Sequence, residues 1–550
     1  MADIWNFEPE LLESLDAGVP EILASQKPNG QFGTEPWICN DQNNLFPLGV
    51  AWSLEASEHH HNDRVLEAIL LGGDALIEDA DENAKWTFRK KDHSTWGQIH
   101  QPWTYSRWIR SYCLTRDAFA SEDRKRWDDF LQFAFTRIAE EDISRLHNIP
   151  AHHAMALYFA GTLFEREEWL TQSRDFLHRI VDSQTPDGWW AEHAGPVVMY
   201  NFVYVESVGT YYAISNDEYV LPSLERAADY HSNFVYPDGS MVETIDGRNP
   251  WHSGVRVGNP GFAHTAKGRG FLKQQHSLHT ATGKNFGADY AASILLHGAE
   301  GEFEPTASDA GEHTYRMSDD ALVMRQGPWF YVLSAYCAPI PENRWGQDRQ
   351  NLVSVYHDEL GLIIGGGNTK LQPMWSTFTV GDTSLLKHSP GEENPDFAPD
   401  IPLFHVPSES KLAAEASEVS FKYGEETCSV SVEIKSESEL HLILEATVNS
   451  EMPVEAHVTL IPHQEQTLTT SSADNISLTE ERLEDNVAWM EHAGWRLELP
   501  DGASFIWPTL PHNPYRKGGE GFLDEALISV RLPFSKENTR QVVKLIVGGP

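Results

Sequence analysis

The sequence predicts a multidomain protein of mixed α and β class: an N-terminal (α/α) toroid, an incomplete barrel of helix pairs, followed by an antiparallel β-sandwich. Two observations carry this prediction. Apolar residues recur with helical spacing in the first half of the 550 residues, and they alternate with polar residues in the second half. A turn motif also recurs between helices. The chain is too long for one hydrophobic core, so two large domains are expected.

Apolar residues at helical spacing predict helices throughout the first half. The segments are 80–90 (ADENAKWTFRK), 101–119, 122–141, 151–164, 167–184 and 221–235.

A Pro-Asx-Gly turn, a bulky residue and a Glu recur along the helical half. The motif is found in QKPNGQFGTE (26–35), TPDGWWAEH (185–193) and YPDGSMVET (236–244). Pro presets φ and Gly accepts positive φ, so each motif predicts a turn. The spacing of the last two fits a pair of helices with their connections, which favours repeated helix pairs and therefore a toroid or solenoid. The alternative is three unrelated turns.

The second half is expected to hold short strands. Alternating segments lie at 321–337, 351–366, 426–448, 454–463, 495–500, 526–534 and 541–549, as in a large β-sandwich. A polar stretch rich in acids, Gly and Pro precedes them. We therefore expect a catalytic toroid over 1–298, a linker over 299–313 and the sandwich over 314–550.

The net charge of −41, from 82 acidic and 41 basic residues, argues against nucleic acid or an anionic membrane as partner. No apolar stretch approaches a membrane span. The acidic N-terminus lacks a signal pattern, so we expect a cytoplasmic protein as given, or a periplasmic or secreted one whose signal was removed. The four cysteines have no metal or disulfide spacing and are expected to be buried free thiols.

Polar residues cluster at the start of an apolar helix in RLHNIPAHHAMALYFAG (145–161). Pro150 suits the first helical position. Asn148, His152 and His153 then gather at the N-terminal end of the helix. They form either a satisfied polar helix start or one wall of an active site.

The helix after TPDGWWAEHAG carries hydroxyls on one face. Tyr200, Tyr204, Ser207 and Tyr211 are spaced by four, three and four residues, with Asn201 beside them. For any single Tyr, an interior position with a bonded hydroxyl is an equally good interpretation. Together they favour a polar groove.

The segment 246–279 is basic in an acidic chain. Its cations, Arg248, Arg256, Lys267, Arg269 and Lys273, and four His face a single acid, Asp246, which favours an anion site over a solvated face. Tryptophans in or near loops are candidate platforms for sugar rings, although most Trp pack in cores. These are Trp96, Trp103, Trp189 and Trp190.

A basic patch, a Tyr face and an Asn/His cluster suit β-elimination at a 4-linked uronic acid. Neutralising the carboxylate acidifies the C5 proton, a Tyr or His takes that proton, and a Tyr protonates the departing oxygen. General acid–base assistance contributes about 10²–10⁴-fold, and stabilisation of the enolate-like charge contributes much of the rest. No metal or organic cofactor is needed.

With these motifs the chain resembles the heparinase II/III-like and related alginate lyases, built from an (α/α) toroid and an antiparallel β-sandwich. The resemblance covers most of the chain. It implies that Asn148 and His152 or His153 neutralise the carboxylate. It also implies that Tyr204, with Tyr200 as its rival, is the acid, with the role of base open between Tyr and His. It also implies that His357, in NLVSVYHDELGLIIGGG, assists as base or carboxylate contact.

Substrate-binding residues are expected at Arg248, His252, Arg344, Trp103, Trp189 and Trp190. The expected partner is an anionic polysaccharide or oligosaccharide, and a homo-oligomer is left open. His357-Asp358 is only a fragment of the zinc-binding strand motif of some relatives, so no metal is expected.

Two other functions compete with the lyase. A glycoside hydrolase needs two carboxylates about 5–10 Å apart, and Glu192, Glu206, Glu243 and Asp246 are the candidates. A non-catalytic carbohydrate-binding protein needs aromatic and charged residues but no Tyr face beside an Asn/His cluster.

Overall fold

The computed structural model describes residues 4–306, 311–389 and 391–548, which form two compact units. The helical unit comprises Met1–Trp190, Tyr200–His231 and Arg256–Thr306, and the β-sandwich unit comprises Ala191–Met199, Ser232–Val255 and Ala307–Pro550. Two short segments of the first 298 residues thus belong to the sandwich unit. Residues 307–310 of the expected linker lie outside the described residues.

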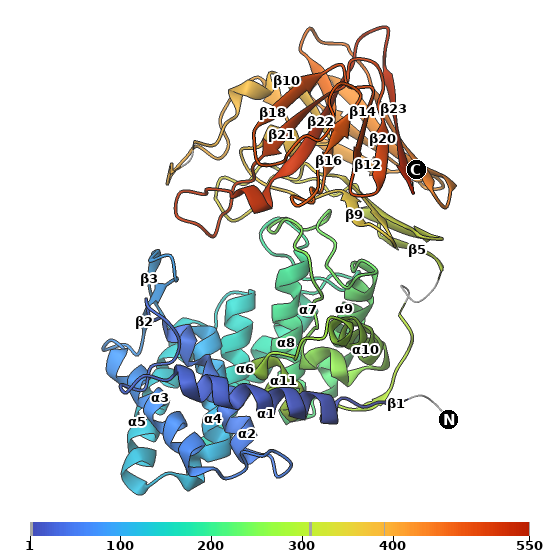
Figure 1. The fold of residues 1–550 in the computed structure, drawn as a ribbon. Helices are drawn as coiled ribbons and strands as arrows, with labels where there is room; N and C mark the ends of the chain where they lie inside the picture. Colours follow the sequence, from blue (N-terminus) through green and yellow to red (C-terminus); the bar gives the residue numbers. More distant parts are fainter. Residues whose placement is uncertain (1–3, 307–310, 390, 549–550) are drawn as a thin grey trace. The chain divides into compact units, whose positions relative to one another are not determined.

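Helices make up most of the first half of the chain, as predicted (Figure 1). Neighbours in the helical unit include α2 on α4, α4 on α6, α6 on α7, and α11 on both α1 and α2. No helix in the described part of the chain is long and apolar enough to cross a membrane. The helices are α1 (Glu8–Ser25), α2 (Leu45–Ser53), α3 (Asp63–Asp79), α4 (Pro102–Thr115), α5 (Ser121–Glu141), α6 (Asn148–Leu163), α7 (Glu167–Asp182), α8 (Val198–Ser215), α9 (Leu221–Asn233), α10 (Ala266–Ala281) and α11 (Ala288–His297).

Aromatic side chains fill much of the helical core. Trp108 of α4 meets Trp127 of α5 edge-on at 5.3 Å between ring centroids, and Tyr112 packs on the same Trp127 at 5.1 Å. All three rings are fully buried. Because burying such rings contributes more free energy than any single polar contact, these residues fix how α4 and α5 pack.

The prediction of a helix over 80–90 is wrong. Part of this segment is strand β2 (Trp86–Arg89), paired antiparallel with β3 (Thr95–Ile99) in a hairpin. Trp86-Thr87-Phe88 combines aromatic and β-branched residues that favour strands. Asp92 accepts hydrogen bonds from the Ser94 amide (3.0 Å) and hydroxyl (2.6 Å), which closes the turn.

The first two Pro-Asx-Gly turns share one construction, which disfavours unrelated turns. The Gln26 side chain donates to the Gly30 carbonyl (3.2 Å) and to a carbonyl of α3 (2.8 Å). Gln184 donates to the Gly188 carbonyl (2.9 Å) and to a carbonyl of α9 (3.0 Å). Gly188 has φ +88°, and a Cβ there would lie 2.1 Å from the Arg226 carbonyl oxygen, so only glycine fits.

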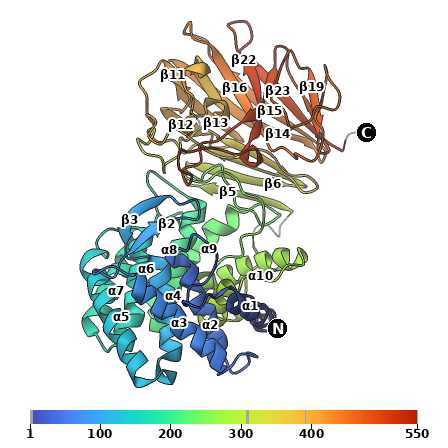
Figure 2. The ribbon, with the colours of Figure 1, turned by 60° about the vertical axis from the view of Figure 1, so that its left-hand side comes forward.

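The second half forms the predicted antiparallel β-sandwich (Figure 2). In the described residues, the larger sheet has the order β18-β21-β22-β16-β9-β8-β7-β6-β5 with β10 and β11 at its side, and the smaller has β12-β13-β14-β15-β23-β20-β19-β17. The strands are β5 (Glu312–Met317), β6 (Ala321–Gln326), β7 (Trp329–Ser334), β8 (Val353–His357), β9 (Gly361–Ile364), β10 (Phe378–Gly381), β11 (Leu403–Phe404), β12 (Glu409–Leu412), β13 (Glu418–Tyr423), β14 (Glu426–Ser436), β15 (Glu439–Ala446), β16 (Val454–Leu460), β17 (Thr469–Thr470), β18 (Arg482–Asp485), β19 (Trp489–His492), β20 (Trp495–Glu498), β21 (Ser504–Thr509), β22 (Leu527–Pro533) and β23 (Arg540–Val547). A further short pair joins β1 (Ile4–Trp5) to β4 (Gly301–Glu302).

Alternation along the strands builds the sandwich core. In β14, Cys428, Val430 and Val432 are buried, and Val430 pairs with Leu444 of β15 in the register. These side chains pack in one cluster with residues of the other sheet, such as Val355. The alternation of apolar and polar residues in the sequence therefore identifies the buried face of the strand. All four cysteines are free, with Cys39 and Cys428 buried, Cys337 partly exposed and Cys113 exposed.

Candidate active site

Helix α6 begins at Asn148, two residues earlier than Pro150 suggests, and His147 precedes it. Asn148 and His152 are one turn apart and share a face. Asn148, His152 and His153 are all buried. The predicted polar cluster is therefore an interior feature of the helical unit and not a solvated helix start.

His152 lies among charged and aromatic groups of neighbouring helices. Its ring stacks on Trp103 of α4 at 5.7 Å between centroids, and its Nε2 is 3.7 Å from Oε2 of Glu206 on α8. The Val203 backbone also lies beside the ring. Within the described residues, neither ring nitrogen has a hydrogen-bond partner of full geometry. Burial lowers the pKa of His152 to about 4, so the imidazole is neutral at pH 7.

Two arginines of α4 complete this surrounding. Arg107 pairs with Asp289 of α11 at 2.6 Å and lies 3.8 Å from Glu206, while Arg110 lies 4.0 Å from Glu206. Nη1 of Arg107 and both terminal nitrogens of Arg110 are buried without a hydrogen-bond partner in the part of the chain that the structure describes. We call Trp103, Arg107, Arg110, His152, Glu206 and Asp289 the α6 cluster.

His153 faces a different set of groups. The ring nitrogen Nδ1 of His100 is 2.5 Å from Asp142, and His153 lies beside both residues. Burial is the largest effect on His153 and lowers its pKa to about 4. His153 therefore connects α6 to His100, the residue that follows β3. We interpret this role of His153 as structural.

The hydroxyl face of α8 divides into buried and accessible members. Tyr204 is 2% exposed and stacks on Trp190 at 5.1 Å. The Ser207 hydroxyl donates to the Tyr204 carbonyl at 3.0 Å, and the Tyr211 hydroxyl donates to Asp217 at 2.7 Å. Tyr200 is partly exposed. Of the two rival tyrosines, Tyr200 is thus the more exposed.

The predicted tryptophan platforms are mostly interior. Trp190 is 1% exposed, and its indole nitrogen donates to the Ile180 carbonyl at 2.8 Å. Its amide donates to the Asn201 side chain at 2.8 Å, which fastens the loop to α8. Trp189 is also buried, whereas Trp103 is partly exposed. Trp189 and Trp190 therefore pack a core, as most tryptophans do.

In the β-sandwich unit, the structure brings Arg248 and Arg344 to one ring. Their guanidinium carbons lie 5.4 Å and 5.3 Å from the ring centroid of Trp345. Tyr515 lies 5.7 Å from the same ring, and its hydroxyl accepts from Nε of Arg248 at 3.1 Å. Arg248 also pairs with Glu192 at 2.6 Å, and the Glu192 side chain is fully buried. We call these five residues the Trp345 cluster. His252 is exposed.

His357 has a structural surrounding. It ends β8 at 3% exposure, and its Nε2 lies 3.2 Å from the Glu437 carbonyl oxygen. Its Nδ1 accepts the Glu359 amide at 3.2 Å. Since both nitrogens are engaged, the geometry favours a structural role over the predicted catalytic one.

The basic segment 246–279 is divided between the units, at Val255 and Arg256. Lys267 pairs with Asp229 at 2.8 Å, and Arg269 donates to the Glu302 carbonyl at 2.6 Å. These two cations stabilise the helical unit locally. The segment is not a single anion site.

Three carboxylates of the rival hydrolase hypothesis are structural in the sandwich unit. Glu243 accepts the Tyr236 hydroxyl at 2.8 Å and the Gly366 amide at 2.9 Å, an arrangement we call the Glu243 network. Burial raises the pKa of Glu243 to about 7. Asp246 accepts the amides of Arg248 and Asn249, both at 2.8 Å. Glu192 is committed to Arg248. The fourth, Glu206, belongs to the α6 cluster.

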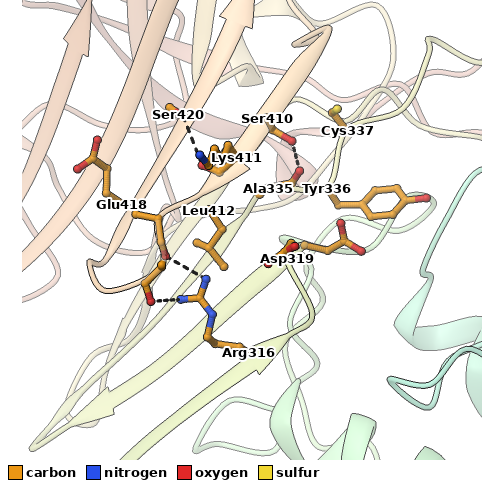
Figure 3. Close-up of a pocket in the computed structure, with 13 residues that line it drawn as sticks. Arg316, Asp319, Ala335, Tyr336, Cys337, Ser410, Lys411, Leu412, Glu418 and Ser420 are labelled. Carbon is orange, nitrogen blue, oxygen red and sulfur yellow. Dashed lines mark hydrogen bonds between the residues drawn. The ribbon is translucent and has the colours of Figure 1, made fainter.

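A separate cavity of about 910 Å³ lies in the sandwich unit (Figure 3). Arg316 crosses one side, where it donates to the Ala413 carbonyl at 3.0 Å and the Ala414 carbonyl at 3.4 Å. None of the predicted site residues lines it. In the described part of the chain, no three His, Cys, Asp or Glu side chains are grouped to hold a metal.

Sequence comparison finds no family model and no curated protein that matches the chain. Structure comparison finds strong likenesses. Heparinase III matches with a TM-score of 0.55 at 14% identity, over 98% of this chain and 85% of that one. The Streptomyces coelicolor A3 chondroitin AC lyase matches with 0.54 at 13%, over 99% and 80%. Paenibacillus xanthan lyase matches with 0.57 at 11%, over 99% of this chain but only 58% of its own.

The chain has the fold of these polysaccharide lyases. The likeness runs through both the helical domain and the β-sandwich, because it covers nearly the whole chain in each case. The predicted order of a helical domain followed by an antiparallel β-sandwich is thereby confirmed.

Proposed function

We propose that the protein is a polysaccharide lyase that cleaves a uronic-acid-containing glycan by β-elimination. The observation that carries the proposal is the α6 cluster. Among the described residues, buried ring nitrogens of His152 and guanidinium nitrogens of Arg110 have no hydrogen-bond partner of full geometry. Because native interiors satisfy nearly all buried polar groups, a cluster of exceptions on a lyase fold supports a site for a polar ligand.

Asn148 and His152 serve as donors to the uronate carboxylate in this proposal. The imidazole of His152 is neutral at pH 7 and donates one N–H. It therefore carries no positive charge that would bind it more strongly to Glu206. Hydrogen bonds that neutralise the carboxylate stabilise the enolate-like intermediate after the C5 proton leaves. Arg107 and Arg110 add positive potential behind these donors.

Tyr200 is the acid and base of the proposal, with Tyr204 as its buried rival. The phenolate takes the C5 proton, and the electron pair of that C–H bond forms the C4–C5 double bond. The C4–O bond breaks, and the same phenol returns the proton to the departing glycosidic oxygen. The sequence of steps is balanced in protons and needs no water.

The Trp345 cluster of the sandwich unit is proposed as a binding surface in its own right for an anionic glycan. Trp345 and Tyr515 offer ring faces, and Arg344 and Arg248 offer cations that favour carboxylate or sulfate. Arg248 is held by Glu192, so it chiefly positions the two rings.

An ultraviolet absorbance assay tests the proposal. The protein is incubated with alginate, heparan sulfate, chondroitin sulfate, hyaluronan, ulvan or pectate, and reducing ends are counted in parallel. Elimination creates a conjugated C4–C5 double bond that absorbs, whereas hydrolysis does not. We expect absorbance and reducing ends to rise together. Reducing ends without absorbance would contradict the proposal and favour the hydrolase.

A further inference from the structure

The β2–β3 hairpin of the helical unit has a charge opposite to that of the chain. Residues 85–99 hold Lys85, Arg89, Lys90 and Lys91 against the single acid Asp92, whereas the whole chain holds 82 acidic and 41 basic residues. In Figure 1 the hairpin stands out from the helices of its unit. A basic projection on an acidic protein attracts anionic chains while the rest of the surface repels them.

Aromatic rings accompany the cations. Phe88 and Trp96 lie 4.9 Å apart between centroids, and Nζ of Lys90 is 4.6 Å from the Trp96 ring centroid. Both rings are partly exposed, and Arg89 is exposed. No ion pair holds Arg89 within the described residues, in contrast to Lys85, which pairs with Glu141 at 2.8 Å. The hairpin thus offers a ring face beside a cation.

Space for a ligand lies next to Arg89. A cavity of about 190 Å³ is lined by Arg89, Lys85, Trp37 and Gln98 together with the carboxylates of Asp79 and Asp81. The cations suit an acidic group, and the amide and carboxylate oxygens suit sugar hydroxyls. An acidic sugar carries both kinds of group.

The hairpin is held firmly at both ends, although an isolated two-stranded hairpin is only marginally stable. At its base, the Trp86 indole donates to the Leu76 carbonyl at 3.1 Å and packs on Tyr105 at 4.8 Å. Near its tip, Nζ of Lys91 donates to the Thr34 carbonyl at 2.8 Å and to Asp41 at 2.5 Å. A preorganised surface loses less entropy when it binds.

The end of the hairpin leads directly into the α6 cluster. His100 follows β3 and bonds to Asp142 beside His153, and Trp103, three residues later, stacks on His152. The hairpin and the α6 cluster therefore border the same part of the helical unit.

We propose that the β2–β3 hairpin binds the anionic polysaccharide at sugar residues away from the cleaved linkage. Arg89 and Lys90 contact carboxylate or sulfate groups, and Phe88 and Trp96 contact the faces of sugar rings. This inference rests on the proposed function for its substrate class, but binding is measured without cleavage.

The test is native affinity electrophoresis on ice, in gels cast with each of the six polymers and, as a control, with neutral dextran. Arg89→Ala/Lys90→Ala is compared with Lys125→Ala/Lys284→Ala, which removes two exposed cations elsewhere in the helical unit. We expect the hairpin variant to raise the apparent dissociation constant at least about 5-fold, with a shallower salt dependence. The control variant should bind as the wild type does.

Trp96→Leu tests the ring contact independently of charge and should weaken binding without changing the salt dependence. Circular dichroism and thermal unfolding establish that each variant folds. Equal binding by the hairpin and control variants would overturn the inference, as would retardation of the wild type by none of the six polymers. If the polymer retards the protein through the hairpin but no absorbance develops in the cleavage assay, the proposed function fails while the hairpin site stands.

Discussion

Two buried polar groupings of this protein differ in how their hydrogen bonds are satisfied. In the Glu243 network of the sandwich unit, each carboxylate oxygen has a donor, from Tyr236 or from Gly366. In the α6 cluster of the helical unit, both ring nitrogens of His152 and two nitrogens of Arg110 have no partner of full hydrogen-bond geometry among the residues described. A satisfied network stabilises the fold, whereas unsatisfied groups lower stability and fit a ligand.

Activity is where the proposed active site, which joins Asn148 and Tyr200 to the α6 cluster, should differ most from the Glu243 network. We expect Asn148→Ala and Tyr200→Phe each to lower kcat by about 10²–10⁴-fold, because each removes a group that acts on the reacting sugar. Tyr204→Phe should have a smaller effect, since Tyr204 is buried against Trp190. Initial rates of absorbance change on the cleaved polymer measure this. Near-normal rates for both Asn148→Ala and Tyr200→Phe would remove the site assignment.

Stability should depend more on the Glu243 network than on the α6 cluster, which is the reverse of the order expected for activity. Glu243→Ala removes the acceptor of the Tyr236 hydroxyl and of the buried Gly366 amide, at about 1–3 kcal/mol each. Arg110→Met removes a cation that is incompletely bonded, and Arg107 stays 3.8 Å from Glu206, so the loss should be smaller than for Glu243→Ala. Urea unfolding of both variants gives the comparison, and a larger loss for Arg110→Met would contradict it.

The contribution of the Glu243 network to the free energy of unfolding should also fall as the pH rises. Its folded pKa of about 7 exceeds the ordinary value of 4.5, so between these values the folded state holds the proton more tightly than the unfolded state. Stability is therefore lost as the pH rises through this window, with a slope of at most about 1.4 kcal/mol per pH unit. Glu243→Gln, which mimics the protonated side chain, should flatten the profile between pH 5 and 8. An unchanged slope in that variant would be evidence against the buried acid.

His152 should show a dependence of opposite sign. Its folded pKa of about 4 lies below the ordinary 6.5, so the unfolded state binds the proton more readily between these values. Stability is lost as the pH falls through this window. In His152→Gln, the decline of the melting temperature from pH 6.5 to 4.5 should be shallower than in the wild type. The other buried histidines set the remaining slope.

Much of this comparison could be predicted from local patterns. Helical and alternating spacing predicted both halves of the fold, and the polar start of α6 predicted Asn148 and His152. The segment 80–90 was mistaken for a helix because its strand is only Trp86–Arg89 and owes its form to pairing with β3. Short strands of this kind give little periodicity to detect.

The partners of the site residues were beyond sequence reasoning. Arg107, Arg110 and Asp289 join the α6 cluster through contacts between helices that are distant in the chain. Trp345 and Tyr515 likewise meet Arg248 from separate loops. The excess of Arg and Lys in 246–279 favoured an anion site. Local spacing could not show that Lys267 and Arg269 have structural partners.

The most direct test of the central claim is a single absorbance experiment on the polymer that the wild type cleaves. Wild type, Tyr200→Phe and Glu243→Gln are assayed side by side at pH 7, each after its fold has been checked by circular dichroism. The account predicts that Glu243→Gln forms the C4–C5 double bond at a rate near that of the wild type, while Tyr200→Phe is almost inactive. An active Tyr200→Phe beside an inactive Glu243→Gln would contradict it and move the chemistry to the Glu243 network.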